Sequence, residues 1–168
     1  MVPAVEEVST GEPEELVRQN ALTKAQAGRA TAASAGLVVG CDTEVFLDGV
    51  ALGKARDRDE AETHLAALSG RTHTVLGGLV VLGAEGPGSR AGERTGVSRT
   101  EVTFRRLDAE ITSAYLDSGE WRGRAGAYAI QGLGSSMVTA VNGDLSNVIG
   151  LPVGLLHQLA PELFASRA

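Results

Sequence analysis

Small and apolar residues near the start of the chain recur with the period of a helix. Val17, Ala21, Lys24 and Gly28 fall on one face of the helix that this spacing predicts over residues 13–33. Lys24 therefore interrupts an otherwise small and apolar stripe. Its ammonium group must reach either an anion or water.

A continuous apolar run at residues 37–42 predicts a buried strand that ends at Asp42. A second short strand at residues 45–47 is expected to follow after a tight connection. The pair Asp48-Gly49 is typical of a hairpin turn. These signals place Asp42 where a buried strand leaves the sheet.

The remaining pattern alternates strands with helices. It predicts a helix begun by Asp57 or Asp59 and stopped by Gly70, a strand at 74–82, a mobile hairpin loop at 83–98, a strand at 99–105, a helix from Asp108 to Gly119, a short strand at 137–141, and a final helix opened by Pro152. This order indicates an α/β fold in a single domain that spans residues 1–168. Helices should flank its sheet.

Charge and cysteine content narrow the functional classes. The formal net charge of −6 argues against a surface for nucleic-acid polymers, which are held mainly by excess Lys and Arg. The single cysteine, Cys41, cannot form a disulfide within the chain and is treated as a packing residue. No apolar stretch approaches the roughly 20 residues of a membrane helix. A cytoplasmic protein without a membrane partner is expected.

The residues best suited to chemistry are Asp42 and the pair Gly53-Lys54 that follows it. A carboxylate at the end of a buried strand is a common place for metal and phosphate chemistry, and a lysine on the next loop is a natural phosphate partner. From the residues alone, Asp42 is equally well explained as a turn cap. Lys24 and Lys54 are the only lysines in the chain, and either could be an ordinary surface side chain.

Several short runs together resemble the Maf family of nucleotide pyrophosphatases. They stand in the family's order, with its approximate spacing: Gly40-Cys41-Asp42-Thr43, Leu52-Gly53-Lys54, Leu68 to His73, Thr100 to Phe104, Gly119-Glu120, Ala125 to Gly132, and Asn147 to Pro152. No single run is decisive, but their sum is highly specific.

The resemblance implies hydrolysis of nucleoside triphosphates to monophosphate and pyrophosphate, with Mg²⁺ or Mn²⁺ as cofactor. It implies a mixed, curved sheet flanked by helices, with the active site in a central cleft between two lobes, and a possible homodimer. The run Ile130-Gln131-Gly132 looks like the branch that prefers dTTP and UTP. Removal of unwanted nucleotides and an influence on cell division are also associated with the family.

The resemblance also assigns roles to individual residues. Asp42 is implied to be the general base and a metal ligand. Glu7 is implied to be a second metal ligand or a residue that positions the water; by itself, Glu7 is more often part of a solvated surface pair. Lys24 and Lys54 match phosphate-contacting positions. We therefore expect Asp42, Lys24 and Lys54 to converge on one cleft.

Three further residues are expected to contact the substrate. Gln131 could read a base edge with its paired donor and acceptor, or it could tie down a glycine-rich loop. Thr43 could help to select the base or bond the local backbone. Arg124 stands where the family commonly has lysine, and its forked guanidinium suits phosphate oxygens.

One departure from the family pattern concerns the beginning of the chain. The family opens with a strand and a phosphate-binding Ser-x-Ser-x-Arg-Arg loop, and nothing like it precedes Glu7. The chain is therefore expected to be truncated relative to the family, or its start to have been assigned too late. The competing hypothesis is a non-catalytic nucleotide-binding protein or a regulator of cell division.

Overall fold

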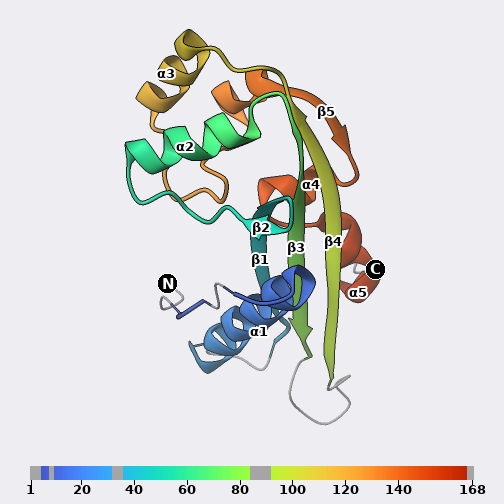
Figure 1. The fold of residues 1–168 in the computed structure, drawn as a ribbon. Helices are drawn as coiled ribbons and strands as arrows, with labels where there is room; N and C mark the ends of the chain where they lie inside the picture. The colour runs from blue at the N-terminus through green and yellow to red at the C-terminus, as the bar shows by residue number, and fades with distance from the viewer. Residues whose placement is uncertain (1–4, 8–9, 32–35, 84–91, 166–168) are drawn as a thin grey trace.

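A computed structural model describes residues 5–7, 10–31, 36–83 and 92–165. Its strands form one sheet in the order β2-β1-β3-β4-β5, and every pair of neighbours is antiparallel. The strands are β1 (Val38–Leu47), β2 (Val50–Ala51), β3 (Thr72–Leu82), β4 (Glu93–Phe104) and β5 (Val138–Asn142). Figure 1 shows β3 and β4 as the longest members, running through the whole body.

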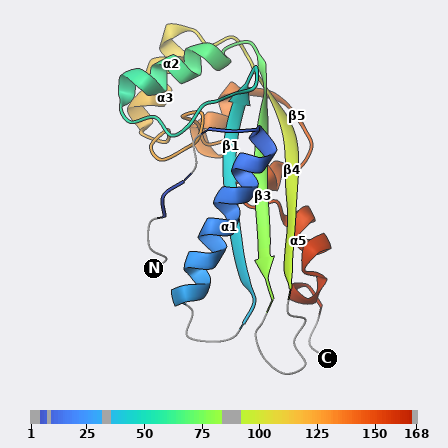
Figure 2. The same ribbon diagram turned by 60° about the horizontal axis from the view of Figure 1, so that its bottom comes forward.

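Helices flank this sheet, so the expected α/β class is confirmed. They are α1 (Pro13–Thr31), α2 (Arg58–Leu68), α3 (Ala109–Ser118), α4 (Leu145–Ile149) and α5 (Val153–Leu159), with short 3₁₀ turns η1 (Gly132–Met137) and η2 (Pro161–Leu163). In Figures 1 and 2, α2 and α3 lie together at one end, and α1 runs along the strands. Within the described residues, no helix has the length and apolar character needed to cross a bilayer.

Glycines let helices approach both faces of the sheet closely. A Cβ at Gly78 of β3 would lie 2.2 Å from the Val17 carbonyl oxygen, and one at Gly40 of β1 would lie 2.2 Å from the Ala21 carbonyl oxygen. On the opposite face, a Cβ at Gly77 would lie 1.9 Å from the Asn147 side-chain oxygen. Helix α1 is therefore seated against one face, and α4 against the other.

The largest buried cluster lies beneath α2 and α3. It contains Leu65 and Leu68 of α2, Tyr115 of α3, and Phe104 of β4, all almost fully buried. A smaller cluster packs Val17 of α1 onto the sheet. Both clusters include residues from the C-terminal end of β1: Val45 and Leu47 in the larger one and Phe46 in the smaller one.

Several local predictions are confirmed. Asp57 and Asp108 cap α2 and α3, each accepting a hydrogen bond from a backbone N–H three residues on. Asp48 and Gly49 both have positive φ and close the β1–β2 hairpin, as the hairpin pattern requires. The predicted end of the first helix, beyond Thr31, falls partly on residues outside the described ranges.

The predicted break after Asp42 is wrong. The strand β1 continues through Asp42, which pairs with Gly78, and through Thr43, which pairs with Gly77. The Asp42 side chain does not interrupt the backbone pairing of the strand, because its oxygens accept hydrogen bonds from Asn20 and Lys24 of α1. A charged residue within this apolar run therefore does not end the strand.

The hairpin loop predicted over residues 83–98 is too long. Strand β4 begins at Glu93, and the pairing with β3 runs from Glu93 opposite Leu82. Its polar, glycine-containing start is held by backbone pairing, and Gly96 leaves room for Leu155 of α5. Residues 84–91 lie outside the described ranges. The sequence pattern predicts no helix at the position of α4, although Asp144 caps it.

His73 of β3 is buried, with 2% of its surface exposed, and its Nε2 lies 2.9 Å from the Tyr128 hydroxyl. Burial lowers the pKa of His73 to about 4, from an ordinary value of 6.5. The unfolded chain therefore takes up this proton first as the pH falls. The stabilisation due to the neutral ring is complete above pH 6.5 and is lost as the pH falls towards 4.

We expect this titration to be visible in the pH dependence of unfolding. The free energy of unfolding should fall by up to about 1.4 kcal/mol per pH unit across this window because of His73 alone. Urea unfolding at several pH values, with His73→Phe beside the unaltered chain, measures this contribution. A variant with the same slope as the unaltered chain would contradict it.

Candidate active site

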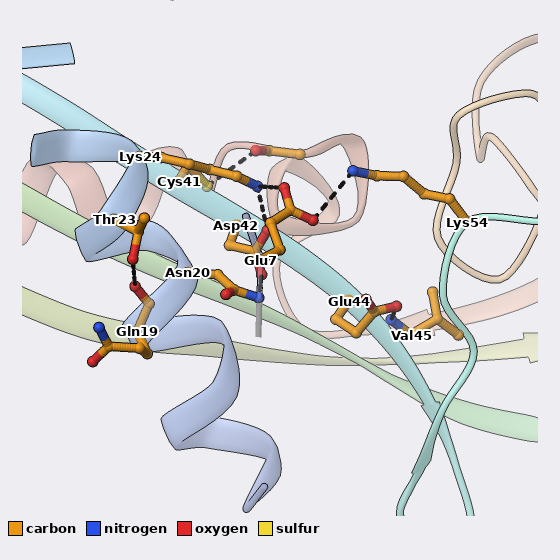
Figure 3. A network of polar contacts seen from close by, with 11 residues as sticks. Glu7, Gln19, Asn20, Thr23, Lys24, Cys41, Asp42, Glu44, Val45 and Lys54 are labelled. Carbon is orange, nitrogen blue, oxygen red and sulfur yellow. Dashed lines mark hydrogen bonds and ion pairs between the residues drawn. The ribbon is translucent and has the colours of Figure 1, made fainter. Parts of the chain in front are cut away.

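Asp42 lies in the middle of β1, on the face that α1 covers, and only 6% of its surface is exposed. The Lys24 ammonium donates a hydrogen bond to Oδ1, and the Asn20 amide donates one to Oδ2 at 3.2 Å. Both donors come from α1, one helical turn apart. Figure 3 shows the two side chains directed towards the carboxylate. The buried charge is thus paired and oriented.

Glu7 connects the two lysines. Its Oε1 lies 2.8 Å from the Lys24 ammonium and its Oε2 lies 3.4 Å from the Lys54 ammonium. The three segments that carry these residues are far apart in sequence. They are joined through Glu7, and Lys24 also contacts Asp42 (Figure 3). The expected convergence of Asp42, Lys24 and Lys54 is therefore present.

The charges of this cluster stabilise one another. Partial burial alone would raise the pKa of Glu7, but the hydrogen bond and charge of Lys24, with a smaller contribution from Lys54, hold that pKa below its usual value. Burial alone would lower the pKa of Lys24, but Asp42 and Glu7 outweigh it and raise that pKa. Glu7 is thus kept ionised and Lys24 protonated near neutral pH.

Glu44 lies two residues beyond Asp42 and so projects from the same face of β1. Burial, together with repulsion from Asp42, raises the pKa of Glu44 to about 7, although the Val45 N–H partly offsets this by donating to Oε1 at 3.0 Å. A carboxyl group with this pKa can change its protonation state near neutrality. Glu44 was not selected from the sequence.

One pocket opens beside this cluster and gathers most of the predicted site. Lys24, Asp42, Thr43, Lys54, Arg124 and Gln131 all line it. Glu7 does not line the pocket, but it bonds two residues that do. Arg124 and Gln131 are exposed at its rim, whereas Asp42 is buried. The pocket is therefore charged at its base and open at one side.

The pocket follows the edge of β1. Asp42 projects to the α1 face, while Cys41 and Thr43 project to the other face, yet all three contribute to the lining. Among the described residues, β1 pairs with β2 on this edge at Phe46 and Leu47, and the Val45 carbonyl accepts a hydrogen bond from the Leu52 N–H at 2.7 Å. A ligand can therefore reach side chains from both faces of the sheet.

The opposite wall comes from α4 and the residue after it. Val148, Ile149 and Gly150 line the pocket. Asn147 anchors this wall, since its buried amide donates to the Val75 and Ser98 carbonyls at 3.1 and 3.3 Å. This part of the lining is apolar, whereas α1 contributes the charged Lys24. Such an arrangement suits a ligand with a charged end and a flat, less polar end.

Cys41 belongs to the lining but not to the reactive groups. Its thiol donates to the Gly150 carbonyl at 3.1 Å, and burial raises its pKa to about 11. The thiol is therefore neutral at physiological pH and a poor nucleophile. This geometry agrees with the predicted packing role.

Two polar residues at the site, Asn20 and Glu44, were missed from the sequence. Asn20 precedes Lys24 by four residues and so shares its helix face, and Glu44 follows Asp42 by two residues on a strand. Applying these periods outward from the selected residues would have found both.

The carboxylates offer oxygen ligands of the type that Mg²⁺ and Mn²⁺ prefer. Glu7 and Asp42 already share one cationic group, the Lys24 ammonium, so this spot accommodates positive charge. Within the described part of the chain, no group of three or more His, Cys, Asp or Glu side chains is placed to hold a metal ion. A cation here would need further oxygen ligands from the bound molecule or from water.

This arrangement of the charged groups, together with the sequence motifs, agrees with a family comparison. A sequence model of the family described as Maf-like protein matches residues 1–163. The chain belongs to the Maf-like protein family. The resemblance seen in the sequence motifs is therefore confirmed.

The chain is also similar in sequence to individual curated proteins. A dTTP/UTP pyrophosphatase of Caldanaerobacter subterraneus subsp. tengcongensis is 40% identical over 161 residues, covering 95% of this chain and 76% of that protein. A nucleoside triphosphate pyrophosphatase of Xylella fastidiosa is 44% identical over 149 residues, or 88% and 76% of the two chains. A dTTP/UTP pyrophosphatase of Xanthomonas campestris is 43% identical over 150 residues, with the same two shares.

Proposed function

We propose that this Maf-like protein hydrolyses nucleoside triphosphates to nucleoside monophosphate and pyrophosphate, with dTTP and UTP preferred. The names of its relatives support this reaction and these substrates. The observation that carries the proposal is the convergence of Asp42, Lys24 and Lys54 at one pocket. A buried carboxylate beside two ammonium groups provides a base next to a binding site for phosphate oxygens.

Each charged residue has a distinct role in this proposal. A water molecule attacks the α-phosphorus, the bond to the bridging oxygen breaks, and pyrophosphate leaves. Asp42 takes the proton of the attacking water. Lys24, Lys54 and Arg124 stabilise the negative charge on the phosphate oxygens.

Lys24 links substrate binding to the state of Asp42. Its ammonium is shared between Asp42 and Glu7 before any ligand is bound. Phosphate oxygens that enter the pocket compete for this ammonium, which weakens its hold on the Asp42 carboxylate. The base then becomes more available when the substrate is in place.

We include a divalent cation, Mg²⁺ or Mn²⁺, in the proposed reaction. Glu7 and Asp42 are the residues that would hold it, since their oxygens already face one positive charge. When bound, the cation would supply additional stabilisation of phosphate charge. Cytoplasmic location and a homodimer remain predictions from the sequence.

A turnover assay tests the proposed function directly. The purified chain is incubated with dTTP, UTP, CTP, GTP or ATP and Mg²⁺ or Mn²⁺, and the monophosphate and pyrophosphate are quantified. Equal amounts of the two products support the proposal, whereas release of inorganic phosphate with the diphosphate contradicts it. Binding of nucleotides without turnover would favour the non-catalytic alternative.

Lys54 is expected to act mainly through substrate binding. Its ammonium is half exposed and contacts Glu7 at the pocket, so it can follow the phosphate tail without holding Asp42. Lys54→Met should raise KM by about tenfold, with a smaller change in kcat, because one charge-assisted contact is lost. Steady-state kinetics with UTP measures both constants.

Arg56→Met provides the matched control for Lys54→Met. This nearby cationic side chain is exposed and paired with Glu60, and it does not line the pocket. Its removal should leave KM unchanged. If both substitutions raised KM equally, the effect of Lys54→Met would come from the lost positive charge in this region and not from a contact of Lys54 with the substrate.

A further inference from the structure

Glu120 holds the segment that follows Gln131. Its Oε1 accepts a hydrogen bond from the Leu133 N–H at 3.1 Å, and its Oε2 accepts one from the Gly134 N–H at 3.2 Å. These two N–H groups belong to the first turn of η1, where the helix itself provides no acceptor. One carboxylate thus satisfies two backbone donors.

The glycines of this turn are fitted around the carboxylate. Gly132 has φ of +62°, and a Cβ there would lie 2.5 Å from Glu120 Oε1. A Cβ at Gly134 would lie 1.8 Å from the Ala129 carbonyl oxygen. The backbone of residues 129–134 therefore folds tightly on itself and against Glu120, so a change at Glu120 is transmitted to the whole turn.

Glu120 is itself fixed to the end of α3. It follows Gly119, whose left-handed conformation (φ of 72°) ends that helix. From the same helix, the Tyr115 hydroxyl accepts a hydrogen bond from the Ala129 N–H at 2.9 Å. The end of α3 thus binds the segment on both sides of Ile130 and Gln131. Tyr115 binds the residue before this pair, and Glu120 binds the backbone after it.

With this arrangement, the Gln131 side chain is not needed to hold the turn. Gln131 occupies the position before η1, where a side chain would ordinarily cap the turn, but it makes no capping hydrogen bond. It is exposed and lines the pocket. The sequence allows two roles for Gln131: contact with the base, or fixing the glycine-rich loop. Glu120 fixes this loop through its hydrogen bonds to Leu133 and Gly134.

We propose that Glu120 is a positioning residue that fixes the placement of Gln131 and so sets the preference for the nucleobase. This inference rests on the proposed function, because it assumes that Gln131 contacts the base of a nucleotide. Glu120 does not line the pocket and need not touch the substrate. Its effect passes through the backbone of residues 131–134.

The experiment measures base discrimination, which a loss of stability alone does not change. The ratio of kcat/KM for UTP to that for ATP is determined for the unaltered chain, Glu120→Ala, Gln131→Ala and the double variant. Glu120→Ala should lower the ratio by about tenfold, as expected when a contacting group loses its placement. The double variant should be no less selective than Gln131→Ala alone, because both changes remove the same contact.

Two further variants separate positioning from charge and from folding. Glu120→Gln retains a carbonyl oxygen for one of the two N–H groups and should keep most of the selectivity. Glu62→Ala removes an acidic group from an exposed position of α2 and should leave the ratio unchanged. An unchanged ratio in Glu120→Ala while Gln131→Ala alters it, or multiplicative losses in the double variant, would overturn the proposal.

A binding measurement distinguishes failure of the proposed function from failure of this inference. If the unaltered chain turns over no nucleotide, the same ratio is measured as dissociation constants for UTP and ATP by calorimetry. Loss of that binding ratio in Glu120→Ala supports the positioning role without catalysis. A chain that binds neither nucleotide, or binds both equally well, overturns the role of Glu120.

Discussion

Replacing Asp42 with asparagine is expected to lower kcat for UTP by about 10²–10⁴-fold, the usual contribution of a general base. The substitution keeps the shape of the side chain, and an amide oxygen can still accept from Lys24. Asn20 can turn its own amide to meet the new NH₂ group, so the fold should be retained. Steady-state kinetics and thermal unfolding of the same preparation separate the two effects.

Asp48→Asn is the control for this substitution. Asp48 is an exposed aspartate in the turn that follows the same strand, and it is paired with Arg71. Its replacement should leave kcat within about twofold, since exposed ion pairs contribute little. Normal turnover by Asp42→Asn would remove the proposed base and, with it, the assignment of the catalytic centre.

Replacing Gly78 with alanine is expected to destabilise the protein by about 3 kcal/mol or more. The added methyl group would meet the carbonyl oxygen of Val17, whose backbone belongs to a helix and cannot move alone. Helix α1 would have to shift off the sheet and take Asn20 and Lys24 away from Asp42. Turnover should therefore fall along with stability.

Gly92→Ala is the matched control for Gly78→Ala. Nothing lies within 4 Å of a Cβ built at Gly92, so the same chemical change there meets open space. Its effect should stay within about 0.5 kcal/mol. Urea unfolding gives both values, and equal stabilities of the two variants would show that the seating of α1 is more tolerant than its geometry indicates.

The seating of α1 explains why one helix can serve both stability and the candidate chemistry. Val17 and Ala21 press on the glycines of β3 and β1, and this contact fixes the height of the helix above the sheet. Asn20 and Lys24 are then held at hydrogen-bonding distance from Asp42. The small residues of the stripe therefore set the position of α1 on the sheet, and this position brings the lysine within reach of Asp42.

The candidate site residues were largely predictable because their side chains violate the local pattern. Lys24 interrupts a small-residue stripe, and Asp42 interrupts an apolar run, so each requires a partner that its own segment does not supply. Arg124 and Gln131 carry no such signal, and the family resemblance is what predicts them. Their position at the pocket agrees with that prediction, while their roles remain proposals.

The errors in the predicted elements share a physical cause. The sequence pattern predicts the end of a strand at Asp42 because a buried charge is costly, but α1 supplies the hydrogen-bond donors that remove this cost. The start of β4 resembles a loop in sequence because it is polar and contains glycine, but its pairing with β3 depends on backbone groups. In both places, a partner distant in sequence decided the structure.

The sequence by itself determined the helix caps, the hairpin at Asp48-Gly49, and the candidate acid and amines, since each depends on side chains and neighbours within a few residues. Only the tertiary structure decided that Glu7 bridges the two lysines and that Asn20 completes the hold on Asp42. It also decided that Glu120 accepts hydrogen bonds from N–H groups thirteen and fourteen residues further on. Hydrogen bonds and ion pairs act over a few ångströms, and folding alone brings such groups within that range.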